Sequence, residues 1–235
     1  ASFLYSAGMM LNDAADAKWD ATHKADRAIP SGRISARSVW LMGFGGMAFG
    51  AVLCILAGAQ WWWVLALVLA ILFYDLFHKP WAGSVLIMGA CRMLLYVVAA
   101  SANSLTADVW LWGVLLGVYI VALSLVAREE GRGTITDPRR WLYLLLLLLP
   151  SLAVMKPDVS LVQIALFFSS AALILFCLRQ MKCGRSRIGD AVGWLLAGIP
   201  LVDALALSDV QPQAALAMLL LPPLLKVWQR WVAAT

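Results

Sequence analysis

The chain has 235 residues, of which 63% are hydrophobic and 13% are charged, and its mean hydropathy is +0.85. Soluble domains carry about 25% charged residues, so this composition excludes an ordinary soluble enzyme and indicates a protein whose solvent is a lipid bilayer. The formal net charge of +5 has a topological explanation given below, and no nucleic-acid partner is expected.

Apolar runs between polar breaks predict an all-α, multi-pass transmembrane helical bundle that forms a single domain over residues 1–235. A spanning helix needs about 20 apolar residues to cross about 30 Å of hydrocarbon. The first run is too short to span, and we interpret it as the end of a helix whose beginning is truncated. The predicted segments, about nine in all, are 1–11, 38–58, 61–77, 84–101, 109–126, 141–155, 160–179, 191–207 and 214–232.

The polar stretch after the first segment carries an amide and three carboxylates at helical spacing: Asn12, Asp13, Asp16 and Asp20. If the first helix continues through them, they fall within an arc of roughly 100°. Carboxylates gathered on one face repel one another unless a cation lies between them. Hard oxygen ligands suit Mg²⁺, which usually binds through one or two carboxylates plus substrate phosphates. The alternative interpretation is a solvated polar helix end.

A basic loop follows the acids. Pro30 and Gly32 predict a turn, and Arg27 and Arg33 stand on either side of it. Arginine binds phosphate oxygens as a fork. Acids followed by arginines within a short stretch are what a site for magnesium and a diphosphate needs, because the metal bridges oxygens and the arginines neutralise the remaining charge.

Basic and non-basic breaks alternate along the chain. Residues 12–37, 127–140 and 179–187 are rich in Lys and Arg, and residue 79 adds a lysine, whereas the breaks near residues 60, 104 and 209 contain none. The positive-inside rule therefore places the basic loops in the cytoplasm. We interpret Arg139, Arg140, Arg185 and Arg187 as topology signals.

Two charged residues lie inside apolar runs. An intramembrane cation such as Arg92 usually faces a cavity or a partner, so Arg92 either contacts substrate or forms an ion pair with Asp75 or another acid. Asp203 is either a proton-relay acid of a transporter or a residue paired within the bundle.

The first two motifs carry a family resemblance. Residues 12–20 resemble the NDxxDxxxD motif of the UbiA prenyltransferase superfamily, and residues 27–35 resemble its RPxPSGRIS stretch, with Ala28 in place of the usual proline. Tyr74 and Lys79 resemble its Tyr–Lys motif with a spacing one residue longer than usual. Residues 89–96 resemble the helix after that motif.

The second acidic motif of the family, DxxxDxxxGxxT, is altered. Gly133 and Thr136 align with its glycine and threonine, Glu129 replaces its second aspartate, and Leu125 replaces its first. Glu130 lies next to Glu129 as a possible replacement ligand. The altered motif and the longer Tyr–Lys spacing are similar to UbiA-like proteins of bacterial secondary-metabolite clusters, such as the EboC group.

The resemblance implies a UbiA-like bundle in a bacterial inner membrane, with its active-site loops cytoplasmic. It implies a transferase that uses Mg²⁺ to move a prenyl group from an isoprenyl diphosphate to a small lipophilic, aromatic acceptor. The implied catalytic residues, which also bind the metal, are Asp13, Asp16, Asp20 and Glu129, with Glu130 as a further metal ligand. The implied substrate-binding residues are Asn12, Arg27, Arg33, Tyr74, Lys79, Arg92 and Arg128.

Two other functions compete with the enzyme. Leu125 supports a non-catalytic UbiA-like protein that binds or transports an isoprenoid or metabolite. Asp203 and Arg92 would serve a transporter, but the acidic cluster lies at a membrane rim, whereas transporter sites lie near the bilayer midplane. The sequence therefore favours a prenyltransferase.

Overall fold

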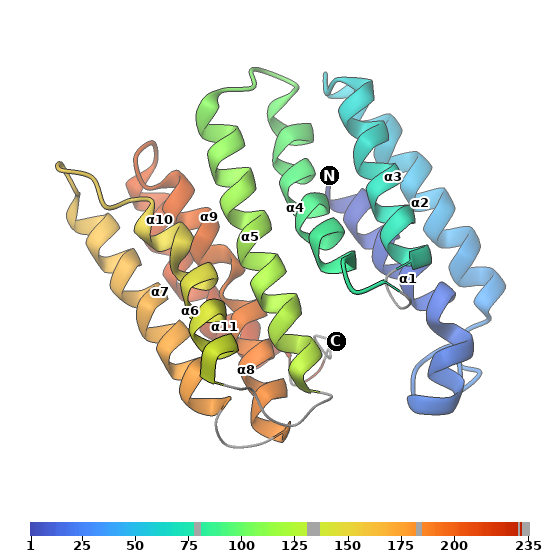
Figure 1. Ribbon diagram of the computed structural model, residues 1–235. Coiled ribbons are helices and arrows are strands. Elements are labelled where there is room, and N and C mark those ends of the chain that lie inside the picture. Colours follow the sequence, from blue (N-terminus) through green and yellow to red (C-terminus); the bar gives the residue numbers. More distant parts are fainter. Residues whose placement is uncertain (78–80, 131–136, 182–184, 230, 232–235) are drawn as a thin grey trace. The chain divides into compact units, whose positions relative to one another are not determined.

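The computed structural model describes residues 1–77, 81–130, 137–181, 185–229 and 231, and the regular structure of these residues is entirely helical (Figure 1). The predicted all-α class is confirmed. The chain divides into two compact units, Ala1–Gly113 and Val114–Thr235. The boundary falls inside α5, which spans Ala107–Glu130.

The first unit begins with α1, a continuous helix over Ser2–His23. The apolar run that the sequence predicted to end at residue 11 and the acidic stretch after it therefore belong to one helix. Its first half buries Leu4 and Leu11 completely, while its second half carries the carboxylates. The buried first half of α1 thus fixes the position of the acidic motif on its second half.

Three more helices complete this unit together with the start of α5. They are α2 (Ala36–Leu56), α3 (Trp61–Phe77) and α4 (Ser84–Ala100). Helix α1 packs along α2 and α3, and α3 packs along α4. Their shared apolar core includes Leu4, Leu11, Met47, Val64, Leu67, Ile71, Leu94 and Val98.

Glycines on α2 allow α1 to come close. A Cβ atom at Gly50 would lie 2.9 Å from the backbone nitrogen of Leu4, and one at Gly43 would lie 2.6 Å from the Leu11 side chain. Both distances are shorter than the normal van der Waals contact of a carbon atom with a non-bonded atom. The absence of a side chain at these two positions therefore sets the separation of α1 and α2.

The second unit contains the rest of α5 and the helices that follow it. Helix α6 packs against α7, α7 against α8, and α8 against α11. Their bounds are α6 Asp137–Leu152, α7 Leu161–Gln180, α8 Arg185–Ala197, α9 Ile199–Leu207, α10 Pro212–Ala217, the 3₁₀ turn η1 Met218–Leu220 and α11 Leu221–Trp228.

The predicted segment 191–207 is interrupted at Gly198, so that it forms the end of α8 and all of α9. Pro200 explains the interruption, because proline has no N–H to donate to the carbonyl four residues earlier. The hydroxyl of Tyr119 donates a hydrogen bond of 2.8 Å to the carbonyl oxygen of Leu195 beside the break. The Leu195 carbonyl also accepts a hydrogen bond from the N–H of Gly198 at 3.1 Å, so a side chain of α5 adds a second donor next to the break.

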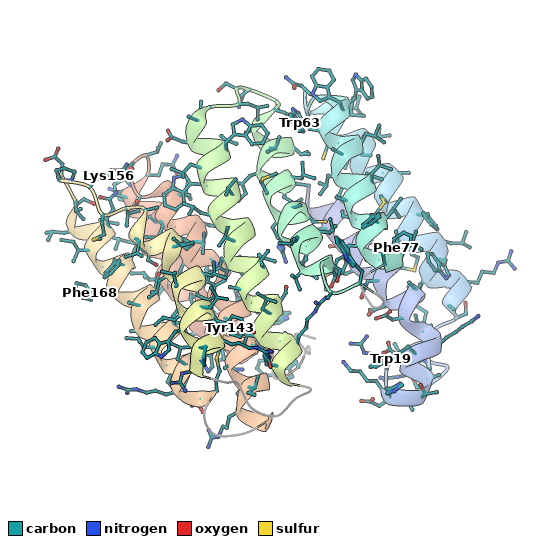
Figure 2. All side chains as sticks on the ribbon, viewed as in Figure 1. Trp19, Trp63, Phe77, Tyr143, Lys156 and Phe168 are labelled. Atoms are coloured by element: carbon teal, nitrogen blue, oxygen red, sulfur yellow. The ribbon has the colours of Figure 1, made fainter. Side chains whose placement is uncertain are left out.

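Among the described residues, four helical stretches are long and apolar enough to cross a membrane: Ala36–Leu56, Ala107–Glu129, Leu161–Gln180 and Arg187–Leu207. Shorter apolar helices cover Trp61–Phe77, Ser84–Ala100 and Pro212–Trp228. Many large apolar side chains on these helices are exposed, such as those of Leu56, Leu69 and Phe168. Figure 2 shows Phe168 pointing outward from α7. These surfaces suit contact with lipid.

Candidate functional site

All four residues of the first acidic motif lie on the second half of α1. Asp13 is exposed, Asn12 and Asp16 are half-buried, and Asp20 is buried. Although the Asp13 side chain is 60% exposed, partial desolvation raises the pKa of its carboxyl, and the nearby positive charge of Arg27 acts in the opposite direction. The motif therefore combines one solvent-facing carboxylate with one that the fold encloses.

Arg27 joins the two ends of this motif. Its Nη1 atom donates to Oδ1 of Asp13 at 3.3 Å and to Oδ2 of Asp20 at 3.0 Å. Asp13 and Asp20 are seven residues apart, so their side chains converge on a single nitrogen across two helical turns. The structure thus places a positive charge between two carboxylates of the predicted metal-binding set.

The loop between α1 and α2 positions Arg27 through its own backbone hydrogen bonds. The N–H of Arg27 donates to the carbonyl of Lys24 at 3.1 Å, and the N–H of Ser31 donates to the carbonyl of Arg27 at 3.0 Å. Gly32 has a φ angle of +74°, a conformation that favours glycine. The predicted turn is therefore present, and it folds the loop back toward α1.

Arg33 stays within the same loop. Its Nε donates to Oγ of Ser31 at 3.0 Å, and its Nη2 donates to the backbone carbonyl of Asp26. The two arginines of the loop thus differ: Arg27 binds carboxylates of the motif, whereas Arg33 binds loop atoms.

Asn12 reaches a different acid. Its Nδ2 donates to Oδ1 of Asp75 at 3.3 Å. Asp75 lies near the end of α3, beside Tyr74, and is 7% exposed. The first motif and the Tyr–Lys segment, which are far apart in the sequence, therefore meet through this hydrogen bond.

Arg92 on α4 contacts Tyr5 of α1. Its guanidinium lies over the Tyr5 ring, 4.1 Å from the centroid, and its Nη2 donates to the Tyr5 hydroxyl. The sequence left open a substrate contact or an ion pair with an acid such as Asp75. The observed partner is an aromatic residue, which satisfies the cation through its ring face and its oxygen.

In the second unit, Glu129 near the end of α5 is buried, with 3% of its surface exposed. Its Oε1 atom accepts hydrogen bonds of 3.0 Å from Nη1 of Arg139 and from the hydroxyl of Tyr143. Both donors belong to α6, and Figure 2 labels Tyr143 beside the end of α5. The glutamate of the altered second motif is therefore held by two residues of the following helix.

The remaining predicted residues are placed as follows. Tyr74 is half-buried on α3, and Leu125 is half-buried on α5, one turn before Glu129. Arg128 is exposed on α5. Lys79, Gly133, Thr136 and the side chain of Glu130 lie outside the described residues.

The donor chemistry of the first motif fits Mg²⁺ as part of a complex with substrate. Within the ranges that the structure describes, no three His, Cys, Asp or Glu side chains form a group able to hold a metal. Mg²⁺ needs no complete protein cage, because it commonly keeps waters and shares substrate phosphates with one or two carboxylates. Asp13 and Asp20 converge on the positive group of Arg27, so a pair of this kind is present.

Sequence reasoning missed three partners in these contacts. Tyr5 and Tyr143 bind charged residues that are 87 and 14 positions away, and a single sequence gives no signal for such pairs. The positive-inside rule indicates a topology role for Arg139, and the structure adds an ion pair with Glu129 at 3.0 Å. Arg139 and Glu129 lie on different helices, so their spacing of ten residues does not predict whether their side chains meet.

Comparison with known proteins gives one positive result. A model of the UbiA prenyltransferase family matches residues 1–130. The match therefore includes the acidic motif of α1, the loop that carries Arg27, and Glu129. No significant match was found among curated proteins or among solved structures.

Proposed function

Because the chain belongs to the UbiA prenyltransferase family and is an integral membrane protein, we propose that it transfers an isoprenyl group, with Mg²⁺, from an isoprenyl diphosphate to a small lipophilic acceptor. An aromatic ring is the acceptor class proposed. The proposed location is a bacterial inner membrane, with the diphosphate bound at its cytoplasmic face.

The observation that carries this proposal is the convergence of Asp13 and Asp20 on one cationic nitrogen beside a second arginine of the same loop. A diphosphate needs positive charge around its oxygens, and a metal bound to it needs carboxylates. The end of α1 and the following loop contain both. We propose Asp13, Asp16 and Asp20 as the residues that would hold Mg²⁺, and Arg27 and Arg33 as the residues that would bind the diphosphate.

In the proposed reaction, the bond between the allylic carbon and the diphosphate oxygen breaks, and both electrons leave with the diphosphate. A nucleophilic atom of the acceptor then forms a bond to that carbon and loses a proton to solvent. Bound Mg²⁺ would supply charge that stabilises the leaving diphosphate. The arginines of the chain would orient the same group and stabilise its added negative charge.

Glu129 and Glu130 are proposed as ligands of a second metal, and Asn12, Tyr74, Lys79, Arg92 and Arg128 as further substrate contacts. For Asn12, the hydrogen bond to Asp75 supports a positioning role next to the carboxylates. For Glu129, the bonds from Arg139 and Tyr143 support a fixed carboxylate orientation.

The test is Mg²⁺-dependent release of diphosphate from a panel of labelled prenyl diphosphates, with a set of aromatic acceptors, by purified protein. We expect Asp16→Asn to lose nearly all Mg²⁺-dependent affinity for these substrates. Asp158→Asn is the matched control, because it removes the same charge from an exposed residue of the α6–α7 loop. Unchanged affinity in a folded Asp16→Asn protein would remove the metal assignment.

A second function, a non-catalytic isoprenoid binder, is favoured by Leu125. An acid at this position would lie one turn from Glu129, and the chain has none there. If the site is complete, wild type releases diphosphate and Glu129→Gln lowers the rate about 100-fold, since a lost electrostatic partner costs a few kcal/mol. If it is incomplete, wild type binds without release and Leu125→Asp restores slow release.

A further inference from the structure

Arg27 occupies a position that the proposed reaction assigns to a metal. One nitrogen of its guanidinium lies within hydrogen-bond distance of both Asp13 and Asp20, at 3.3 and 3.0 Å. A metal ion that used both carboxylates would need the same space between them. The proposed reaction also assigns Arg27 to the diphosphate. Arg27 cannot keep both carboxylate contacts while a metal bridges the same two carboxylates.

Burial explains why Asp20 needs a cation beside it. The Asp20 side chain is only 3% exposed, whereas that of Asp13 is 60% exposed. A buried carboxylate without a partner is strongly destabilising, and Arg27 is the partner that the fold supplies. The backbone bonds of the α1–α2 loop hold Arg27 in reach, from Lys24 at its start to Ser31 beyond it.

Electrostatics excludes a simple addition of the metal to this arrangement. A divalent cation placed between Asp13 and Asp20 would repel a guanidinium at contact distance. The diphosphate offers Arg27 a replacement anion, and arginine binds phosphate oxygens well. The metal takes the two carboxylates from Arg27, and the diphosphate gives Arg27 phosphate oxygens in exchange. This exchange is complete only when metal and diphosphate bind together.

We propose that Arg27 is the counter-ion of the metal-binding carboxylates in the ligand-free protein, and that it moves to the diphosphate when Mg²⁺ and diphosphate bind. This inference rests on the proposed function. It makes the two ligands positively coupled: Mg²⁺ alone competes with Arg27, and the diphosphate removes that competition. By linkage, Mg²⁺ strengthens diphosphate binding by the same factor as diphosphate strengthens Mg²⁺ binding.

The test measures binding of Mn²⁺ alone, by electron paramagnetic resonance of the free ion, to the full chain in detergent. Arg27→Gln should bind Mn²⁺ about tenfold more tightly than wild type, a change within the usual range of coupling between sites. The same variant should bind farnesyl S-thiolodiphosphate, an analogue that does not ionise readily, less tightly at saturating Mg²⁺. Opposite changes in the two affinities are expected if Arg27 pairs with the carboxylates before the ligands bind and with the diphosphate afterwards.

Two variants control for charge. Arg37→Gln makes the same substitution at an exposed arginine in the first turn of α2, which has no role in the proposed site, so its affinity for Mn²⁺ alone should stay at the wild-type value. Lys24→Gln removes an exposed positive charge near Asp13 and should raise that affinity much less than Arg27→Gln. An equal rise in Lys24→Gln would mean that only the net charge matters, and would overturn the proposal.

Arg27→Lys keeps a charge beside Asp20 but lacks the planar fork, so its Mn²⁺ affinity should fall between those of wild type and Arg27→Gln. If Arg27→Gln does not fold, the Mn²⁺ affinity of Arg27→Lys is compared with that of wild type instead. Mn²⁺ affinity that is unchanged or lower in the folded variants would overturn the proposal. Failure of wild type to bind the analogue with Mg²⁺ would instead contradict the proposed function, and with it the movement of Arg27 to the diphosphate.

Discussion

Asp20 and Glu129 are both buried carboxylates, and each accepts a hydrogen bond from an arginine that follows it in the sequence. The distances are 3.0 Å in both pairs, between Arg27 and Asp20 and between Arg139 and Glu129. A buried ion pair contributes little net stability, but removing one partner is costly because a charge is left uncompensated. At the residue scale, we therefore attribute these pairs to the chemistry of the proposed site and not to folding stability.

Tyr143 provides a test of this explanation. Tyr143→Phe removes the hydroxyl that donates to Glu129 at 3.0 Å and should destabilise the protein by about 1–3 kcal/mol, the usual cost of a lost buried partner. It should also lower Mg²⁺-dependent diphosphate release by about tenfold, because a mispositioned ligand loses activity on that order. Thermal unfolding and a Mg²⁺ titration of diphosphate release measure the two effects.

The control for this prediction is Tyr119→Phe. It removes a buried hydroxyl that donates to a backbone carbonyl, that of Leu195, in the same unit. We expect a similar loss of stability with the Mg²⁺ titration unchanged. Equal effects of the two variants on the titration would show that Tyr143 acts through stability alone.

The sequence predicted which residues of the first motif are acidic neighbours, but not how they are paired. Helical spacing placed Asp13, Asp16 and Asp20 on one face, and the structure indeed carries them on one helix. Spacing says nothing of Asp75, which is 63 residues from its partner Asn12. Contacts between helices depend on how the helices pack, and no local pattern encodes them.

At the scale of elements, the approach of α1 to α2 decides where the acidic motif stands. Gly50 and Gly43 face α1 with no room for a Cβ atom, whereas Gly45 on the same helix has open space. The contact face of α2 is therefore defined by two glycines seven residues apart, which lie on the same side of a helix.

Gly50→Ala should consequently destabilise the first unit. Its Cβ atom would lie 2.9 Å from a backbone atom of α1, and backbone does not move aside as a side chain can, so overpacking should cost about 1–3 kcal/mol. Thermal unfolding in detergent measures the loss. Gly45→Ala is the matched control and should be neutral or slightly stabilising, because alanine favours helix. A neutral Gly50→Ala would contradict the close packing of α1 on α2.

Element bounds were predicted well where composition changes sharply. The predicted segment 61–77 coincides with α3, and 84–101 differs from α4 by one residue. The break at Gly198 was not predicted, because Pro200 lies inside an apolar run and the run hides it. The extension of α5 to Glu130 was also missed, since charged residues 128–130 read as loop.

For the whole molecule, the sequence predicted an all-α membrane protein of this family, and both are confirmed. It also predicted one domain over residues 1–235, which stays a prediction. The division into Ala1–Gly113 and Val114–Thr235 was not predicted, because α5 is one apolar run with no polar break near Gly113. The family match ends at residue 130, next to the motif in which this chain departs from the family pattern.

Topology is the property of the whole chain on which the proposed site depends. Helix α5 has 24 residues, about 36 Å at 1.5 Å per residue, and is therefore long enough to cross about 30 Å of hydrocarbon. Helices α3 and α4 have 17 residues each, about 25 Å, so each is barely long enough. Alternation of basic loops predicts that both cross, which puts the ends of α1, α3 and α5 on the cytoplasmic side.

Single cysteines introduced into a cysteine-free background should report this arrangement. The natural cysteines to be replaced are Cys54, Cys91, Cys177 and Cys183. Labels at Ala21, Ala82 and Thr134 should react with a membrane-impermeant maleimide only after the membrane is opened, and a label at Ser104 should react before. Ala21, Ala82 and Ser104 are exposed in the structure, so their reactivity reports sidedness.

Each label tests a different crossing. Ala82 on the side of Ser104 would mean that α3 and α4 enter and leave the membrane by one face, which would remove the Tyr74 segment from the proposed site. Thr134 on the side opposite to Ala21 would contradict the predicted number of membrane crossings between these two positions, and with it the proposal that Glu129 and the carboxylates of α1 serve one site. The proposed two-motif site requires Ala21 and Thr134 on the same side, since a diphosphate is too small to be held by residues on opposite faces of a bilayer.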